Sequence, residues 1–211
     1  MSKALCCFAF ETLINKLKSE STNKVSLKSY FDVLHEDPSH LPSTAPLFIT
    51  WREDSSLRGC IGTFQSYPLE SGVFKFALSS AFQDSRFTPI SAKEVPDLEV
   101  SVTLLDNFIP IANYYDWTIG LHGLKVSLDT SHEHYSGTFL PSVAEEENWD
   151  KSTTLYYLLK KAGYPITKNN VEDFYAKGLE EGWLRLTRYD GLKSYLTYHE
   201  FEKIREIVQA K

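Results

Sequence analysis

Residues 57–62, LRGCIG, place a thiol and a guanidinium in one short apolar run that two glycines interrupt. The run has no helical period and is flanked by bulky apolar residues, which predicts a β-strand. Because strand side chains alternate, Arg58 and Cys60 are predicted to share a face, about 6.6 Å apart along the chain. A nearby cation favours the thiolate, the nucleophilic and metal-binding form of cysteine. The motif therefore predicts a reactive Cys60 beside Arg58, and a core cysteine is the alternative.

Gly59 and Gly62 flank the cysteine within the same run. A glycine inside a strand weakens it and usually marks a bulge or a close approach of a ligand or another backbone. We therefore predict that Gly59, Gly62 and Arg58 contact a ligand. The alternative is that both glycines serve the packing of the strand.

Asp84 and Arg86 follow a stretch of small residues at helical spacing. The planar fork of an arginine suits a carboxylate or a phosphate, so Arg86 is predicted to bind an anionic group, with Asp84 at the same site. Arg58 and Arg86 together would form an anion pocket on an otherwise acidic protein. An ion pair within the loop is the alternative.

His122 lies between glycines in the segment GLHG, residues 120–123. A turn histidine with an ordinary pKa suits proton transfer near neutral pH, so Cys60, His122 and Asp84 are the predicted catalytic residues. A structural histidine bonded to a backbone carbonyl is the alternative. His132 and His134 share a strand face, but two ligands without a third are insufficient for zinc, and no metal ligands are predicted.

Composition limits the class of protein. The chain has 211 residues with a net charge of −6, 42% hydrophobic and 14% aromatic residues, which indicates a folded globular protein. The acidic balance argues against broad nucleic-acid binding. Three cysteines make no disulfide framework, and no signal or membrane-spanning segment is found, so we expect a cytoplasmic or nuclear protein. Motifs for nucleotide, zinc-protease and serine-hydrolase sites are absent, and no cofactor is identified.

The periodicity along the chain predicts helices and strands in mixed order, which indicates a mixed α/β (α+β) fold. A strand, a turn and the LRGCIG strand resemble a hairpin, and capping signals start two of the later helices. The predicted helices cover residues 5–17, 69–81, 150–161 and 197–208, and the predicted strands cover residues 44–51, 57–64, 98–105, 124–128, 132–139 and 183–188.

Several longer segments carry a family resemblance. They are PLFITW (46–51), LRGCIG (57–62), SAFQDSRFTP (80–89), LEVSVTLL (98–105), DWTIGLHG (116–123), TFLP (138–141) and KKAGY (160–164). In this order they resemble the AMMECR-type domain, named for the Alport-syndrome, midface-hypoplasia and elliptocytosis chromosomal region, over roughly residues 4–205. The resemblance implies one domain over residues 1–211, with larger and smaller closely packed lobes around a mixed or antiparallel sheet flanked by helices. It implies no particular reaction.

Two functions are compatible with these residues. The first is an enzyme or small-ligand binder with a Cys/Arg/His cleft, suited to cysteine-dependent group transfer on an anionic or nucleotide-like substrate. The second is a non-catalytic interaction or adaptor module, in which the glycine-flanked strand is a docking groove for a protein partner. An activated thiol would distinguish the first from the second, because a docking groove requires none.

Overall fold

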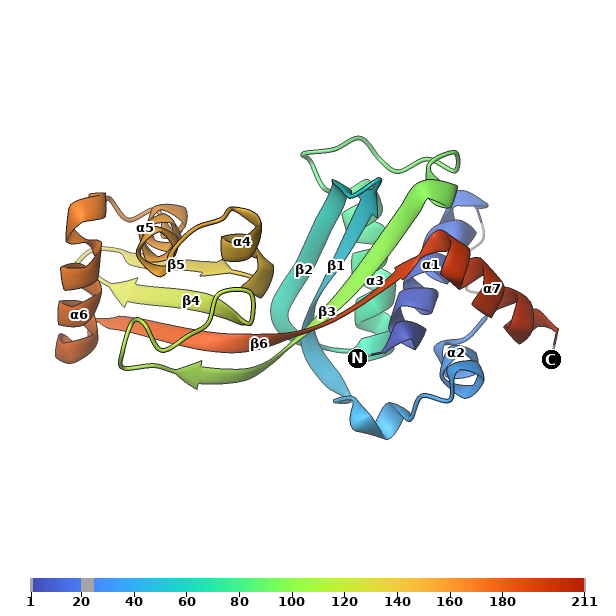
Figure 1. Cartoon of the computed structure of the whole chain (residues 1–211), viewed down its shortest axis with the longest axis horizontal. Helices are drawn as coiled ribbons and strands as arrows, with labels where there is room; N and C mark the ends of the chain where they lie inside the picture. The colour runs from blue at the N-terminus through green and yellow to red at the C-terminus, as the bar shows by residue number, and fades with distance from the viewer. Residues whose placement is uncertain (1, 20–24, 211) are drawn as a thin grey trace. The chain divides into compact units, whose positions relative to one another are not determined.

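The computed structural model describes residues 2–19 and 25–210 and divides the chain into two compact units. Unit 1 is formed by Met1–Leu105 with Leu192–Lys211, and unit 2 by Asp106–Gly191. The strands are β1 (Thr44–Glu53), β2 (Ser56–Pro68), β3 (Leu98–Pro110), β4 (His122–Asp129), β5 (His134–Phe139) and β6 (Leu184–Thr197). In the described residues they are hydrogen-bonded in the order β2-β1-β3-β6-β4-β5 (Figure 1). Strands β3 and β6 each contribute residues to both units.

The hairpin of β1 and β2 carries the LRGCIG motif in unit 1. Asp54 and Ser55 form its turn with φ angles of 47° and 68°, and positive φ at both central turn residues matches the twist of a tight hairpin. The two strands are antiparallel, with Thr50 opposite Cys60. The predicted hairpin is therefore confirmed, and it sets the position of the cysteine.

Helices cover the hairpin in unit 1. They are α1 (Lys3–Leu17), α2 (Leu27–Leu34), α3 (Leu69–Phe82) and α7 (Tyr198–Gln209), with short 3₁₀ turns η1 (Pro38–His40) and η2 (Val95–Asp97). Helix α3 packs against β1 and β2, and α1 packs against α3 (Figure 1). Trp51 of β1 is fully buried and its Nε1 donates to the carbonyl oxygen of Ala77 at 3.1 Å, which ties the hairpin to α3.

Helix α1 differs from its prediction. The spacing of its apolar residues predicts a helix with one buried face, but every residue from Ala4 to Asn15 is buried. Helices α2, α3 and α7 all contact α1, so no side of these turns is left to solvent. A helix surrounded in this way is a core element of unit 1.

Unit 2 contains α4 (Pro141–Glu146), α5 (Lys151–Ala162), η3 (Lys168–Asn170) and α6 (Val171–Glu181) beside β4, β5 and the first part of β6. Helix α5 begins as predicted, because the Asp150 side chain accepts from the Thr153 amide at 2.7 Å. It ends at Gly163, whose φ of 88° suits glycine. Its apolar face packs on β4 and β5.

The antiparallel pairings and the surrounding helices confirm the predicted mixed α+β fold. The capping box of Thr197 and Glu200 is present at the start of α7. Helices α2 and α6 were not predicted: α2 has only eight residues, so its periodicity covers few turns, and α6 contains Gly178, which weakens its helical signal. Among the described helices none combines the length and apolar character needed to cross a membrane.

Candidate functional site

Cys60 is half-buried on β2, opposite Thr50 of β1. The Thr50 hydroxyl donates to the Cys60 sulfur at 3.2 Å. Burial raises the pKa of the Cys60 thiol above its ordinary value, and this effect outweighs the hydrogen bond from Thr50 and the charge of Arg86, which both lower it. The thiol is therefore protonated at neutral pH.

Asp84 lies just after α3 and connects the cysteine strand to the following loop. Its Oδ2 accepts from the backbone N–H of Cys60 at 2.9 Å. Its two oxygens also accept from Nε and Nη2 of Arg86, at 2.9 and 2.7 Å. The hydrogen bonds from Arg86 hold the pKa of the Asp84 carboxyl well below its usual range, although partial burial opposes them. Asp84 is therefore an ionised acceptor that joins Cys60 and Arg86.

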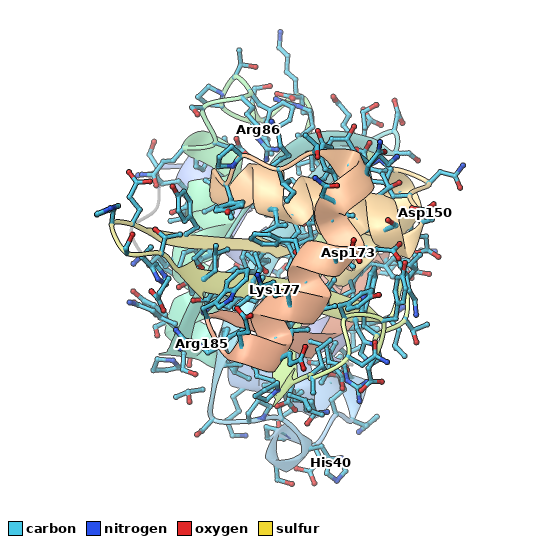
Figure 2. All side chains as sticks on the ribbon, turned by 90° about the vertical axis from the view of Figure 1, so that its left-hand side faces the viewer. His40, Arg86, Asp150, Asp173, Lys177 and Arg185 are labelled. Atoms are coloured by element: carbon cyan, nitrogen blue, oxygen red, sulfur yellow. The ribbon has the colours of Figure 1, made fainter. Side chains whose placement is uncertain are left out.

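Arg86 is the more exposed partner of this pair. Its side chain is 57% exposed, whereas that of Asp84 is 7% exposed, and Figure 2 labels Arg86 at the periphery of the view. The guanidinium also lies over the ring of Phe87, 5.2 Å from its centroid. Asp84 and Phe87 thus fix the orientation of a cation that remains open to solvent.

Arg58 is not the cation that acts on the thiol. Its Nε and Nη2 donate to Glu94 Oε1 at 2.8 and 2.6 Å, and Nη2 donates to the Thr88 carbonyl at 3.2 Å. Arg58 therefore ties β2 to the loop before η2. The prediction that Arg58 lowers the pKa of Cys60 is not supported, since burial raises that pKa and the charges that lower it are those of Arg86 and, more weakly, Arg52.

The physical reason is a β-bulge at Arg58. On β1, Trp51 lies opposite Gly59, but the next residue, Arg52, lies opposite Leu57. Arg58 therefore has no register partner on β1, although its Nε lies 3.8 Å from Glu53 Oε2, and the alternation that would place it with Cys60 is interrupted.

The two glycines of the motif make close backbone contacts within unit 1. A Cβ at Gly59 would lie 1.9 Å from the carbonyl oxygen of Ser80 in α3. A Cβ at Gly62 would lie 2.4 Å from Cγ of Phe48 on β1. Packing therefore accounts for both glycines without a ligand, as the structural alternative expected.

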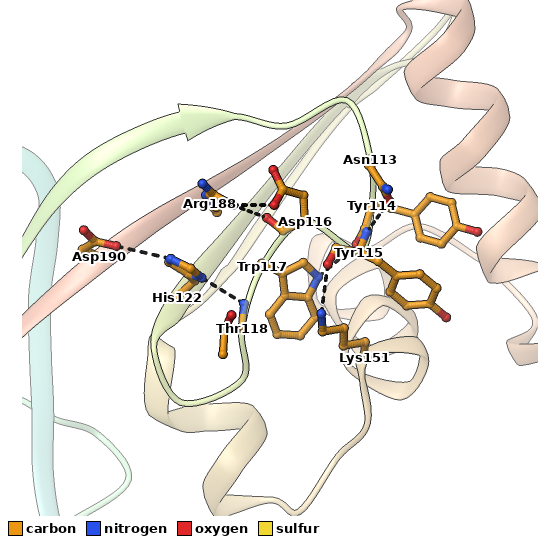
Figure 3. Close-up of polar contacts among 10 residues, drawn as sticks. All are labelled: Asn113, Tyr114, Tyr115, Asp116, Trp117, Thr118, His122, Lys151, Arg188 and Asp190. Carbon is orange, nitrogen blue, oxygen red and sulfur yellow. Dashed lines mark hydrogen bonds and ion pairs between the residues drawn. The ribbon is translucent and has the colours of Figure 1, made fainter.

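His122 begins β4 in unit 2, where a turn and a neighbouring strand hold its ring (Figure 3). Nδ1 accepts from the Thr118 amide at 2.9 Å, and Nε2 lies 3.6 Å from Asp190 Oδ1. The other Asp190 oxygen accepts from Asn107 Nδ2 at 2.7 Å. Because Nδ1 accepts, neutral His122 carries its proton on Nε2. The predicted role as a general base at Nε2 requires Nδ1 to release the Thr118 amide first.

The two histidines of residues 132–134 do not complete a metal site in the described part of the chain, where no group of three His, Cys, Asp or Glu residues could hold a metal ion. His134 Nδ1 lies 2.6 Å from Asp129 Oδ1. The second Asp129 oxygen lies 3.1 Å from Nη2 of Arg185. This is an exposed charge cluster on unit 2.

The structure thus brings Cys60, Asp84 and Arg86 together in unit 1, and it engages Arg58 in a separate ion pair. Sequence reasoning missed Thr50 and Glu94, the partners of Cys60 and Arg58. A turn at residues 54 and 55 alone would place Thr50 opposite Gly59, and the bulge at Arg58 shifts the register by one residue and places it opposite Cys60, so the turn position by itself does not indicate this partner. Glu94 also caps the short turn that follows Ser91, because its Oε2 accepts from the Ser91 amide at 2.7 Å.

These features define a mixed α+β protein with a Cys–Asp–Arg cluster at an edge strand. The AMMECR1 family profile matches residues 6–177, so the chain belongs to the AMMECR1 family. An uncharacterised protein of Saccharomyces cerevisiae is 32% identical over 99% of this chain and 91% of its own length. One of Schizosaccharomyces pombe is 34% identical over 94% of each chain. The crystal structure of an uncharacterised Pyrococcus horikoshii protein is similar with a TM-score of 0.69 and 25% identity, covering 90% of this chain and 89% of that one.

Proposed function

We propose that unit 1 binds a small anionic ligand through Arg86, next to the thiol of Cys60. The observation that carries this proposal is the shared carboxylate of Asp84, which accepts from the Cys60 amide at 2.9 Å and from two nitrogens of Arg86. One buried acceptor thereby holds a solvent-accessible cation close to a half-buried thiol.

The donor capacity of Arg86 supports anion binding. A guanidinium has five N–H donors, and its side-chain bonds to Asp84 use Nε and Nη2. The remaining donors can therefore bind a second acceptor, such as a ligand oxygen, without loss of the Asp84 pair. Because Asp84 and the Phe87 ring already fix the guanidinium, a ligand carboxylate or phosphate would lose little side-chain entropy on binding.

In this proposal Cys60 is a wall of the ligand site with a neutral resting thiol. The raised pKa of Cys60 means that little thiolate is present at neutral pH, although the charge of Arg86 lowers this pKa in part. Chemistry at the sulfur would therefore depend on how much of the Arg86 charge the thiol experiences. Binding is the primary function that we assign to the cluster.

The alternative, a docking groove along β2, is favoured by one observation: β2 is the edge strand of the sheet. Three features oppose pairing with an added strand. Arg58 forms a bulge, and the outward N–H of Cys60 already donates to Asp84. The register of β1 and β2 also shifts a second time, between the pairs Leu47–Thr63 and Ala45–Tyr67. Natural proteins use such bulges and covers to prevent edge pairing, so the ligand site is the better supported function.

Two alkylating probes of opposite character test the proposal. Iodoacetate is anionic and iodoacetamide is neutral, so the ratio of their rates at Cys60 reports anion attraction and is insensitive to the thiol pKa. We expect Arg86→Gln to lower this ratio by about two- to fivefold, the range of an exposed charge interaction. The rates are measured at pH 7.5 by mass spectrometry of the peptide that contains Cys60.

The matched control is Arg185→Gln, which removes the same charge from an exposed ion pair in unit 2. It should leave the ratio at Cys60 unchanged. An equal ratio in Arg86→Gln, Arg185→Gln and the unaltered protein would contradict anion binding at Arg86.

A further inference from the structure

A cavity in unit 1 is lined by none of the residues of the Cys60 cluster. It has a volume of about 190 Å³ and lies where the end of α1, the segment around η2 and the helix α7 meet. Ile14, Leu17, Val95 and Pro96 supply apolar walls. At roughly 30 Å³ for each water molecule, the cavity holds about six water-sized groups. It therefore suits a short aliphatic chain.

A buried ion pair borders this cavity. Glu11 of α1 is fully buried, and its Oε2 lies 2.7 Å from Arg205 Nε while its Oε1 accepts from Arg205 Nη2 at 3.0 Å. The Tyr30 hydroxyl donates to Glu11 Oε2 at 3.0 Å. A buried carboxylate requires such partners. The Glu11 carboxylate in turn fixes the position of the Arg205 guanidinium.

Arg205 also lines the cavity and is not fully engaged by Glu11. Its side chain is 17% exposed, and its Nη1 makes no hydrogen bond to any residue that the structure describes. Lys18 and the Tyr198 side chain lie on the same cavity. The Tyr198 hydroxyl donates to Glu202 at 3.3 Å. Glu202 is therefore an acidic side chain of α7 close to the cavity.

The charges of the lining favour an anion. Lys18 and Arg205 are the charged residues among the described lining residues, and neither Glu11 nor Glu202 is one of them. Because Glu11 neutralises Arg205, Lys18 leaves the lining with one net positive charge. We propose that this cavity binds a small aliphatic monocarboxylate, with its chain between the apolar walls and its carboxylate facing Nη1 of Arg205 and Lys18. A guanidinium anchored from behind by a buried carboxylate recognises a second carboxylate with little reorganisation.

Four probes separate the parts of this recognition: hexanoate, hexan-1-ol, hexylammonium and acetate. Each is titrated into the full chain and followed by two-dimensional ¹H–¹⁵N NMR. We expect hexanoate to shift amides of residues 14–18, 92–96 and 198–205, and to bind at least about fivefold more tightly than hexan-1-ol or acetate. Hexylammonium should bind more weakly than hexan-1-ol.

Variants test the location. Ala92 is exposed and lines the cavity, so Ala92→Leu should reduce hexanoate affinity, whereas Ala112→Leu, at an exposed alanine of unit 2, should not. Lys18→Gln should weaken hexanoate by about two- to fivefold, and Lys177→Gln on the outer surface of α6 should leave it unchanged (Figure 2).

Three results would overturn the proposal. They are no saturable binding of hexanoate, equal affinity for hexanoate and hexan-1-ol, and hexanoate binding that Ala92→Leu leaves intact. Because Arg86 takes no part in this cavity, failure here leaves the anion site at Cys60 unaffected, and the reverse also holds.

Discussion

Replacing Asp84 by asparagine removes the charge that joins β2 to the loop after α3. Asparagine can still accept from the Cys60 amide, so the substitution removes only the charge-assisted part of that hydrogen bond, about 1.5 kcal/mol of the free energy of unfolding. The pair with the half-exposed Arg86 contributes about 0.5 kcal/mol, because solvent screens it. We therefore expect Asp84→Asn to lower the free energy of unfolding by about 2 kcal/mol at pH 7, measured by urea denaturation.

The pH dependence gives this prediction its sharpest test. The folded-state pKa of Asp84 is depressed, so its stabilisation is present above the unfolded pKa of about 4 and is lost as the pH falls toward the folded pKa. Between pH 5 and pH 3 the difference between the unaltered protein and Asp84→Asn should shrink by about 1 kcal/mol.

Asp32→Asn is the matched control for Asp84→Asn. It breaks an exposed i,i+4 pair with Lys28 and should cost no more than about 0.5 kcal/mol. If the unaltered protein and Asp84→Asn differ in free energy of unfolding by the same amount at pH 5 and pH 3, the reasoning is refuted. A loss caused only by the shape of the asparagine side chain would not depend on pH.

Four further substitutions test the packing of the site, two glycine positions and a helix cap by urea denaturation. Gly59→Ala should cost about 3 kcal/mol, because a Cβ 1.9 Å from a backbone oxygen forces β2 away from α3. Gly182→Ala, in open space with a φ of 78°, should cost only about 1 kcal/mol. Cys60→Ser should change stability by less than about 1 kcal/mol, since a hydroxyl can also accept from Thr50, and a larger loss would make the sulfur a packing residue. Thr197→Ala removes one half of a capping box and should cost about 1 kcal/mol, and no loss would contradict the observed cap.

The parts of the fold that the sequence predicted depend on local signals. The helix that begins after Asp150 and ends at Gly163, and the capping box of Thr197 and Glu200, each need residues only a few positions apart. The hairpin is also local, because its turn lies directly between its strands. The missed helix α6 contains Gly178, which packs close to Trp183 and Leu184. Its stability depends on that tertiary contact more than on its own propensity.

The candidate site could be predicted only in part, because its decisive contacts join distant residues. The bond from the Cys60 amide to Asp84 spans 24 positions, and the bond from Arg58 to Glu94 spans 36. The hydrophobic periodicity of a sequence carries no signal for contacts between residues so far apart. The raised pKa of Cys60 has the same origin, since it follows from the burial of the thiol in the folded unit.

The structure separates the packing role of the LRGCIG motif from its possible chemistry. Gly59 and Gly62 are required by the contacts that α3 and β1 make with β2, and Arg58 is required by its ion pair with the loop before η2. Cys60 has no comparable structural requirement, because its one side-chain hydrogen bond is from Thr50 and a serine could accept it. The largest charge effect that favours the Cys60 thiolate comes from Arg86, outside the motif, which Asp84 holds in place. The chemistry of the site is therefore to be sought at Cys60 together with Arg86, and the motif alone does not contain it.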